Sequence, residues 1–341
     1  MNTDPISAPK NLVLGKFIAL AALGMLFPAI GFAQNDRCDP NQVMTSEACA
    51  TCHANESQVW KTTPHYRTFD ELGRRPAAKE ICSKLGLRSV KRSDVCLDCH
   101  FTVQAQGDRN KPISGVSCES CHGASKDWLT THNDFGGPTA TKESESPEHQ
   151  ARRIKNSVEF GMQNTRNLYS IASSCLNCHT VPNERLVNVG GHPAGSQDFE
   201  LVRWSQGQVR HNFLRSGGSE NSHSSPERIR VMYIVGLIAD LEFSTRATAQ
   251  ATEKSEYGLQ VAGRAARIAV QLFNIQQKIN DPRLQAVLKS FANAELRTNN
   301  SAALLQIADQ INAFGVKFSK EADGAKLAEL DPFLPDLSEY K

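Results

Sequence analysis

The pattern of hydrophobic and polar positions divides the chain into two parts. Beyond a Ser/Gly-rich stretch at residues 216–225, apolar residues recur every three or four positions, as on one face of an amphipathic helix. These apolar positions are Ile229, Met232, Ile234, Val235 and Ile238, then the small residues Ala262, Ala265, Ala266 and Ala269, then Leu304, Ile307, Ala308 and Ile311. Ser225-Pro226 and Asp281-Pro282 each place a capping residue before a proline that suits the first helical position. The pattern predicts about four helices between residues 226 and 322, with apolar runs too short to span a membrane.

The part before residue 222 contains few long apolar runs and several short helical patterns. One pattern surrounds Trp60 and is interrupted at Pro64, a second covers residues 154–162, and a third ends at His211. Because such short patterns bury little apolar surface, we expect bound groups to complete the core. The sequence therefore predicts an all-α fold, with short helices and loops around bound groups and a C-terminal helical bundle.

The first 33 residues have the pattern of an export signal. Lys10 and Lys16 precede the short apolar stretch 17–30, and Gly31-Phe32-Ala33 supplies small residues before a cleavage site at Gln34. The alternative is an uncleaved membrane anchor, for which this stretch lies at the lower limit of length. We therefore expect a signal peptide at residues 1–33, followed by domains at 34–222 and 223–341, and a periplasmic location.

Four copies of the pattern Cys-x-x-Cys-His carry the candidate chemistry. The cysteines are Cys49 and Cys52, Cys96 and Cys99, Cys118 and Cys121, and Cys175 and Cys178, and the histidines that follow them are His53, His100, His122 and His179. Two cysteines at this spacing can each form a thioether with a vinyl group of one haem, and the adjacent histidine is then the proximal ligand of the iron. The alternative is a pair of zinc ribbons, but zinc does not require a histidine after every second cysteine. The motifs predict four covalent c-type haems in the domain 34–222.

Composition adds two further expectations. Ten cysteines suit an oxidising compartment or a bound cofactor, and Cys38 and Cys82 remain after the four motifs. In an exported chain we expect these two to form a disulfide; the alternative is two separate buried thiols. The formal net charge of +2 gives no support to nucleic-acid binding.

Six histidines remain outside the motifs, and each iron needs a sixth ligand or an open position. Four of them lie in aromatic, glycine-turn or amphipathic settings and are candidate distal ligands: His65, His132, His192 and His211. The spacing of His132 from the third motif favours a neighbouring haem over its own. His149 and His223 lie in polar surroundings, and we expect them at the surface. The count predicts two histidine ligands for every iron.

Two stretches carry a resemblance to a known family. They are the first motif with Val59-Trp60-Lys61 and His65 behind it, and the segment Gly115-Val-Ser-Cys-Glu-Ser-Cys-His-Gly123 with His132 behind it; the fourth motif also matches. From about Ser46 to Thr180, the chain resembles the tetrahaem cytochrome c-554 family. The resemblance implies periplasmic electron transfer through stacked haem pairs, notably from hydroxylamine oxidoreductase in nitrifiers. It also implies that His65 and His132 are distal ligands, with His132 serving the first haem, and that the second haem is open.

The sequence as a whole favours an exported tetrahaem electron carrier. Its expected partners are redox proteins, such as a hydroxylamine oxidoreductase-like enzyme or a quinol-linked cytochrome, and the C-terminal helices could form a dimer. The competing hypothesis is a haem enzyme with one open position that reduces a small nitrogen or sulfur compound. A third hypothesis is a haem module whose helical domain is a scaffold in a respiratory complex. A high-spin signal in the ferric protein would distinguish the enzyme from the carrier.

Overall fold

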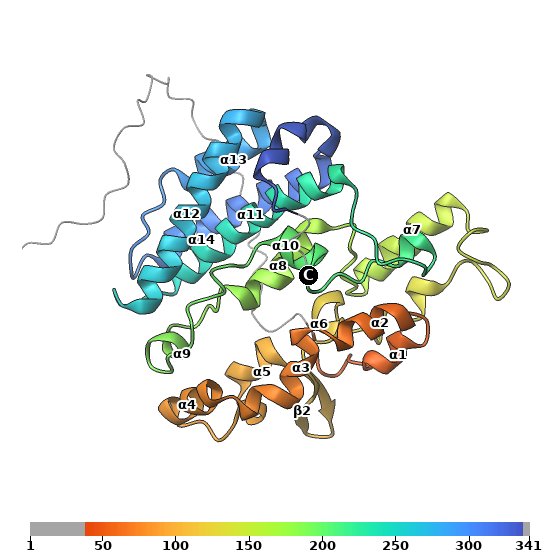
Figure 1. Ribbon diagram of the computed structural model, residues 1–341, viewed down its shortest axis with the longest axis horizontal. Coiled ribbons are helices and arrows are strands. Elements are labelled where there is room, and N and C mark those ends of the chain that lie inside the picture. The colour runs from red at the N-terminus through yellow and green to blue at the C-terminus, as the bar shows by residue number, and fades with distance from the viewer. Residues whose placement is uncertain (1–37, 337–341) are drawn as a thin grey trace, which may run out of the picture. The chain divides into compact units, whose positions relative to one another are not determined.

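The computed structural model describes residues 38–336, and these form one compact unit (Figure 1). The predicted signal peptide and its cleavage site lie outside the described residues. Within the described part of the chain, no helix combines the length and hydropathy that a membrane span requires. The described residues are not divided into separate units at residue 222. The domain boundary predicted there stays a prediction.

The described chain is mostly helical and has few strands, which confirms the predicted all-α class. The helices before the bundle are α1 (Ser46–Ala50), α2 (Ala54–Lys61), α3 (Pro64–Glu71), α4 (Pro76–Leu85), α5 (Asp94–His100), α6 (Cys118–His122), α7 (Pro147–Glu159), α8 (Leu168–His179), α9 (Glu184–Asn188) and α10 (Leu201–Gln206). Short 3₁₀ helices are η1 (Leu72–Arg74), η2 (Val90–Arg92), η3 (Thr131–Asn133), η4 (Leu214–Ser216) and η5 (Gly324–Phe333). The interruption predicted at Pro64 is present, since α3 begins at that proline.

One β-hairpin was not expected from the sequence. Strands β1 (Thr102–Gln106) and β2 (Arg109–Ser114) pair antiparallel, with Gln106 opposite Arg109. The two-residue loop between them contains Gly107 at φ 62°, a conformation that glycine adopts without strain. The hairpin links α5 to α6, so it connects the second Cys-x-x-Cys-His motif with the third.

The four predicted C-terminal helices are present. They are α11 (Pro226–Ala249), α12 (Glu256–Ile279), α13 (Pro282–Phe291) and α14 (Ser301–Glu321). Both predicted caps are formed, since the side chains of Ser225 and Asp281 accept hydrogen bonds from backbone N–H groups of the first turns of α11 and α13.

The core of this bundle continues into α8 and α10, which lie before the expected domain boundary. Tyr169, Leu176 and Val202 belong to the same hydrophobic cluster as the buried face of α11. Gly315 of α14 lies directly against the ring of Tyr169, and a Cβ at this position would collide with that ring. The bundle therefore packs against the helix that carries the fourth motif.

A second, smaller hydrophobic cluster surrounds the second motif, and it corrects the expected disulfide. Cys82 of α4 is buried in this cluster together with Cys96, whereas Cys38 lies close to the side chains of Asp39 and Glu119. Both thiols are free, so the predicted bridge between Cys38 and Cys82 is not formed. The physical reason is that Cys82 packs among the apolar side chains around the second motif, whereas Cys38 lies beside two carboxylates.

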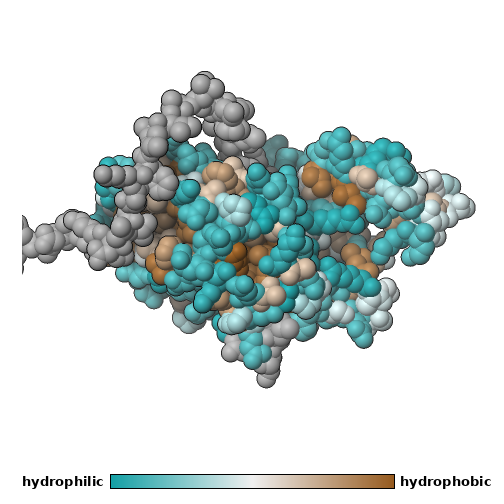
Figure 2. All heavy atoms as spheres, turned by 90° about the horizontal axis from the view of Figure 1, so that it is seen from above, coloured by the Kyte–Doolittle hydropathy of each residue, from teal (hydrophilic) through white to brown (hydrophobic). Residues whose placement is uncertain are grey.

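Hydrophobic residues also reach the surface. Figure 2 shows a face on which hydrophilic residues predominate and hydrophobic ones occur in small groups. On α12, Leu259, Val270 and Phe273 are exposed and share one side of the helix by their spacing.

Candidate haem sites

Each Cys-x-x-Cys-His motif lies on or directly after a short helix. The second, third and fourth motifs end α5, α6 and α8, and the first follows from α1 into a turn. Residues three apart on a helix point to the same side, so the two cysteines of a motif face one bound group. Helix α6 begins with a capping box formed by Ser117 and Ser120.

Two glycines allow other backbone segments to approach the third motif. A Cβ at Gly115 would collide with the carbonyl oxygen of His65, and one at Gly123 with the carbonyl oxygen of Gly161. Gly123 also has φ 86°, in the left-handed region that favours glycine. The sequence Gly115 to Gly123 is therefore suited to contact both α3 and the end of α7.

The structure brings each motif histidine together with one of the four candidate distal histidines. The pairs and the distances between their ring centroids are His53 with His132 at 6.4 Å, His100 with His192 at 6.3 Å, His122 with His211 at 6.1 Å, and His65 with His179 at 6.2 Å. Every candidate is used once. The sequence alone had left open which distal histidine belongs to which motif.

This spacing fits one iron ligated from both sides. A metal–imidazole bond is about 2.0 Å, and the ring centroid lies about 1.1 Å behind the nitrogen, so two opposite ligands have centroids about 6.2 Å apart. Four independent pairs meet this value. Among the described residues, no group of three or more His, Cys, Asp or Glu side chains is arranged to hold a metal ion, as a zinc ribbon would require. The eight motif cysteines would supply two thioether bonds to each of the four haems.

Burial keeps several of these histidines in the neutral form that can ligate a metal. Desolvation, with a smaller effect of neighbouring histidines, lowers the pKa of His100 and His122 to about 4 and that of His179 to about 3. It also lowers the pKa of His65 and His132. A neutral imidazole has one free nitrogen lone pair for iron.

Hydrogen bonds orient many of the rings. Nδ1 of His132, His192 and His211 lies 2.5, 2.9 and 2.6 Å from the carbonyl oxygens of Leu129, Pro193 and Val209. Nδ1 of His122 lies 3.3 Å from the carbonyl oxygen of Gln163, and Nδ1 of His179 lies 2.8 Å from the hydroxyl of Ser196. Because a carbonyl can only accept, the Nδ1 atoms that face one carry the hydrogen and Nε2 is left for the metal.

The four pairs form two neighbouring sets. Helix α1, which carries Cys49, contacts α6, which carries Cys118, and this places the first motif beside the third. The sulfur of Cys178 lies 4.0 Å from the carbonyl oxygen of Asp98, which places the fourth motif beside the second.

Three predicted positions need correction or refinement. Helix α10 ends at Gln206, so His211 lies in the loop beyond the helix instead of at its end. His149, expected at the surface, is half-buried, and its Nδ1 lies 2.7 Å from Oε1 of Glu145. His223 is exposed as expected.

Several residues around the sites were missed from the sequence. Arg264 of α12 donates hydrogen bonds to the carbonyl oxygens of His179 and Ser196 and forms a buried ion pair with Asp240 at 2.7 Å. Glu119, within the third motif, is fully buried. Arg264 is a charged residue in a helical stripe of otherwise small and apolar residues, which is a weak signal of a buried ion pair. No pattern in the sequence predicted the contacts of Arg264 or the burial of Glu119.

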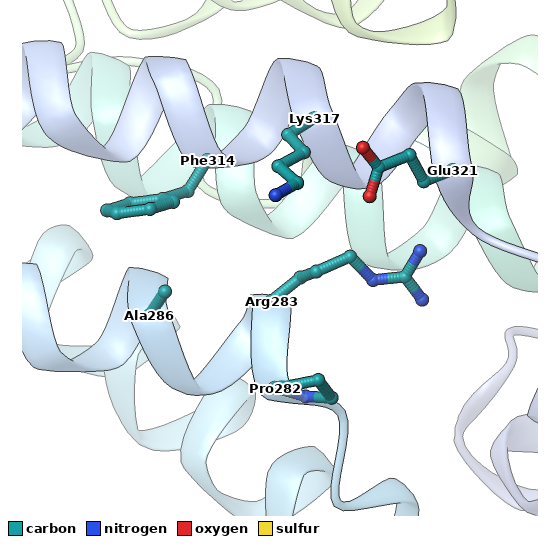
Figure 3. Close-up of a pocket in the computed structure, with 6 residues that line it drawn as sticks. All are labelled: Pro282, Arg283, Ala286, Phe314, Lys317 and Glu321. Atoms are coloured by element: carbon teal, nitrogen blue, oxygen red, sulfur yellow. The ribbon is translucent and has the colours of Figure 1, made fainter.

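One pocket lies away from the histidine pairs. It has a volume of about 430 Å³ between α13 and α14 and is lined by Pro282, Arg283, Ala286, Phe314, Lys317 and Glu321 (Figure 3). None of the predicted site residues lines it, and we assign it no function.

The fold and the motifs together define a c-type cytochrome, an α-helical protein with covalently bound haem. Residues 48–123 match the family described as cytochrome c554 and c-prime. The matched segment contains the first three motifs. The chain is 30% identical over 101 residues to cytochrome c-554 of Nitrosomonas europaea, which covers 26% of this chain and 41% of that protein. The chain therefore spans about two fifths of the length of this curated relative. No solved structure matches.

Proposed function

We propose that this protein is an exported electron carrier that binds four c-type haems, each between two histidines. The observation that carries the proposal is the set of four histidine pairs with ring centroids 6.1 to 6.4 Å apart. Each pair contains one motif histidine, and each motif supplies two cysteines for attachment. The similarity of residues 48–123 to the cytochrome c-554 family supports the same chemistry.

Bound haem would supply one-electron exchange at iron, and this chain would set the conditions for it. The motif cysteines would hold the group covalently, and the paired histidines would supply two neutral imidazoles to the iron. With two strong ligands the iron would be low spin and would change its geometry little on reduction, which favours fast electron transfer. They also leave no position for a small substrate, which favours a carrier over a reductase.

The second motif is where this proposal departs from the family resemblance. The resemblance implies an open haem there, yet His192 lies opposite His100 at 6.3 Å. His192 is held by the turn that follows α9, and its Nδ1 is 2.9 Å from the carbonyl oxygen of Pro193. We propose that His192 closes this haem.

The two sets of motifs suggest a route for the electrons. The first and third motifs are neighbours, as are the second and fourth, and α6 packs against α8. We propose that electrons enter one set and leave from the other. Partners would be redox proteins of the periplasm, such as a hydroxylamine oxidoreductase-like enzyme or a quinol-linked cytochrome. A dimer could use the exposed side of α12 that carries Leu259, Val270 and Phe273.

The test is the haem content and spin state of the protein purified from a periplasmic fraction. We expect the mass of the mature chain to include four haems, and the ferric spectrum to be entirely low spin. Carbon monoxide should not bind to the reduced protein. A mass without haem would end the proposal, and a high-spin haem that binds carbon monoxide would favour the enzyme.

A further inference from the structure

Glu119 is fully buried, with 0% of its surface exposed. Its Oε1 accepts hydrogen bonds from the backbone N–H groups of Met44 at 2.8 Å and Ser125 at 2.9 Å, and from the Ser125 hydroxyl at 2.7 Å. Its Oε2 accepts one from the backbone N–H of Thr45 at 2.9 Å. A backbone N–H can only donate, so these contacts match the acceptor oxygens of a carboxylate.

The charge of this carboxylate is not cancelled by a cation. Among the described residues, Glu119 takes part in none of the ion pairs. Neutral donors stabilise the charge but leave its field in place. The effect reaches neighbouring groups: burial raises the pKa of the Cys38 thiol to about 12, and Glu119 adds to this rise.

The carboxylate also joins the first motif to the third. Met44 and Thr45 lie directly before α1, which carries Cys49, and Ser125 follows α6, which contains Glu119 itself. Helix α1 contacts α6, so the first motif lies beside the third. A buried carboxylate without an ion-pair partner therefore lies within this set of two motifs, whereas Asp98, within the second motif, is exposed to solvent.

We propose that Glu119 lowers the reduction potentials of the haems at the first and third motifs and so directs electrons toward the second and fourth. The inference rests on the proposed function, because it requires haem at these motifs. Reduction adds one electron to a ferric haem, and a nearby negative charge in a medium of low dielectric opposes that step. The electron lost by a haem of the first set is gained by a haem of the second set. The side-chain hydrogen bonds of Glu119 go to Met44, Thr45 and Ser125, so Glu119 acts on the haems through its charge and its position.

The test is a spectroelectrochemical titration of the holoprotein and three variants, all checked by mass for four haems. Glu119→Gln removes the charge, so two of the four potentials should rise, with about tenfold more ferrous haem at a fixed potential, or 59 mV. Ser125→Ala removes one neutral donor and keeps the carboxylate, so the same two potentials should fall. Glu80→Gln, an exposed residue paired with Lys84, removes the same charge at the surface and should change none.

The opposite signs distinguish a charge effect from a packing defect. Shifts of Glu119→Gln and Ser125→Ala in the same direction would overturn the proposal, as would unchanged potentials or equal shifts of all four haems. If Glu119→Gln does not retain four haems, Ser125→Ala decides alone, and potentials that rise or stay unchanged refute the inference. Absence of four haems in the unmodified protein would instead refute the proposed function.

Discussion

At the scale of single residues, His192 decides whether the haem at the second motif is open. Its ring lies opposite that of His100, although His192 comes from a turn more than ninety positions further along the chain. No local sequence pattern extends over such a separation. The same is true of His65, whose ring faces His179. As ligands of one iron, two histidines from distant segments would also hold those segments together.

Replacing His192 by alanine should open one haem. We expect His192→Ala to retain four haems and to show one high-spin haem that binds carbon monoxide when reduced, because His100 would be the only remaining ligand. His223→Ala, in which an exposed histidine is lost, is the matched control and should remain low spin. An entirely low-spin spectrum of His192→Ala would contradict the pairing.

A second residue-scale prediction concerns Glu145, which supports the segment of His132 through Arg153. Arg153 donates hydrogen bonds to both carboxylate oxygens of Glu145 and to the carbonyl oxygen of His132. The hydrogen bond from Arg153 is the main reason why the pKa of Glu145 is lowered to about 2. A lowered pKa stabilises the fold above the ordinary glutamate pKa of about 4.3, and this contribution is lost as the pH falls toward 2.

The pH dependence of thermal unfolding tests this contribution. Glu145→Gln should unfold at a lower temperature than the unmodified protein at pH 7, and the difference should shrink between about pH 4 and pH 2. Glu143→Gln, a substitution of an exposed carboxyl in the same segment, provides the control. A difference that stays constant from pH 7 to pH 2 would show that the charge of Glu145 does not stabilise the fold.

At the scale of elements, the contact of α14 with α8 depends on a glycine. The ring of Tyr169 occupies the space in which a Cβ of Gly315 would lie, and the Tyr169 hydroxyl donates a 2.6 Å hydrogen bond to Glu242 of α11. Three helices therefore meet around one tyrosine, and α8 is held in the bundle by a fixed ring. This contact positions the helix that ends in His179.

We expect Gly315→Ala to destabilise the protein by about 1–3 kcal/mol, because an added methyl group must displace a fully buried ring. Gly263→Ala on α12 is the matched control, since its Cβ would meet no atom closer than 3.6 Å. Alanine favours a helix interior over glycine by about 0.5–1 kcal/mol, so this control should be neutral or stabilising. Thermal unfolding, monitored by circular dichroism, would compare the stabilities of Gly315→Ala and Gly263→Ala. Equal changes in stability for the two variants would contradict the close packing of Gly315 against Tyr169.

At the scale of the whole molecule, the helical bundle and the fourth motif share one buried ion pair. Arg264 and Asp240 are 4% and 5% exposed, and Arg264 reaches from the bundle to the carbonyl oxygens of His179 and Ser196. The Ser196 hydroxyl in turn lies 2.8 Å from Nδ1 of His179. The bundle is thus connected to the proposed haem site by hydrogen bonds as well as by apolar packing.

Arg264→Met should therefore affect both stability and the haem at the fourth motif. It leaves Asp240 buried without its partner, which costs about 3–5 kcal/mol, and it removes two hydrogen bonds near His179. Arg267→Met, an exposed position on the same helix, should change stability by about 0.5 kcal/mol or less. The measurements are thermal unfolding and redox titration of the holoprotein. If only stability changes and all four potentials are retained, the bundle does not influence the haem site.

The sequence by itself predicted which residues would attach a haem and which histidines remained as candidate ligands, and it determined which segments form the terminal bundle. These conclusions depend on local patterns: cysteines at fixed spacing, apolar residues at helical period, and capping residues before proline. The β-hairpin has a local signal at Gly107, but its two strands are short and mostly polar, and the signal was not recognised. The end of α10 before His211 shows that an apolar pattern can extend beyond its helix.

Only the tertiary structure decided which distal histidine faces which motif, that Cys38 and Cys82 lie apart, and that the bundle packs on α8. Each of these depends on contacts between residues that are far apart in the sequence, where spacing along the chain carries no information about distance. The buried charges of Glu119, Asp240 and Arg264 belong to the same class. A charged residue is normally exposed, and it becomes buried only where the fold supplies its hydrogen-bond or ion-pair partners from other segments.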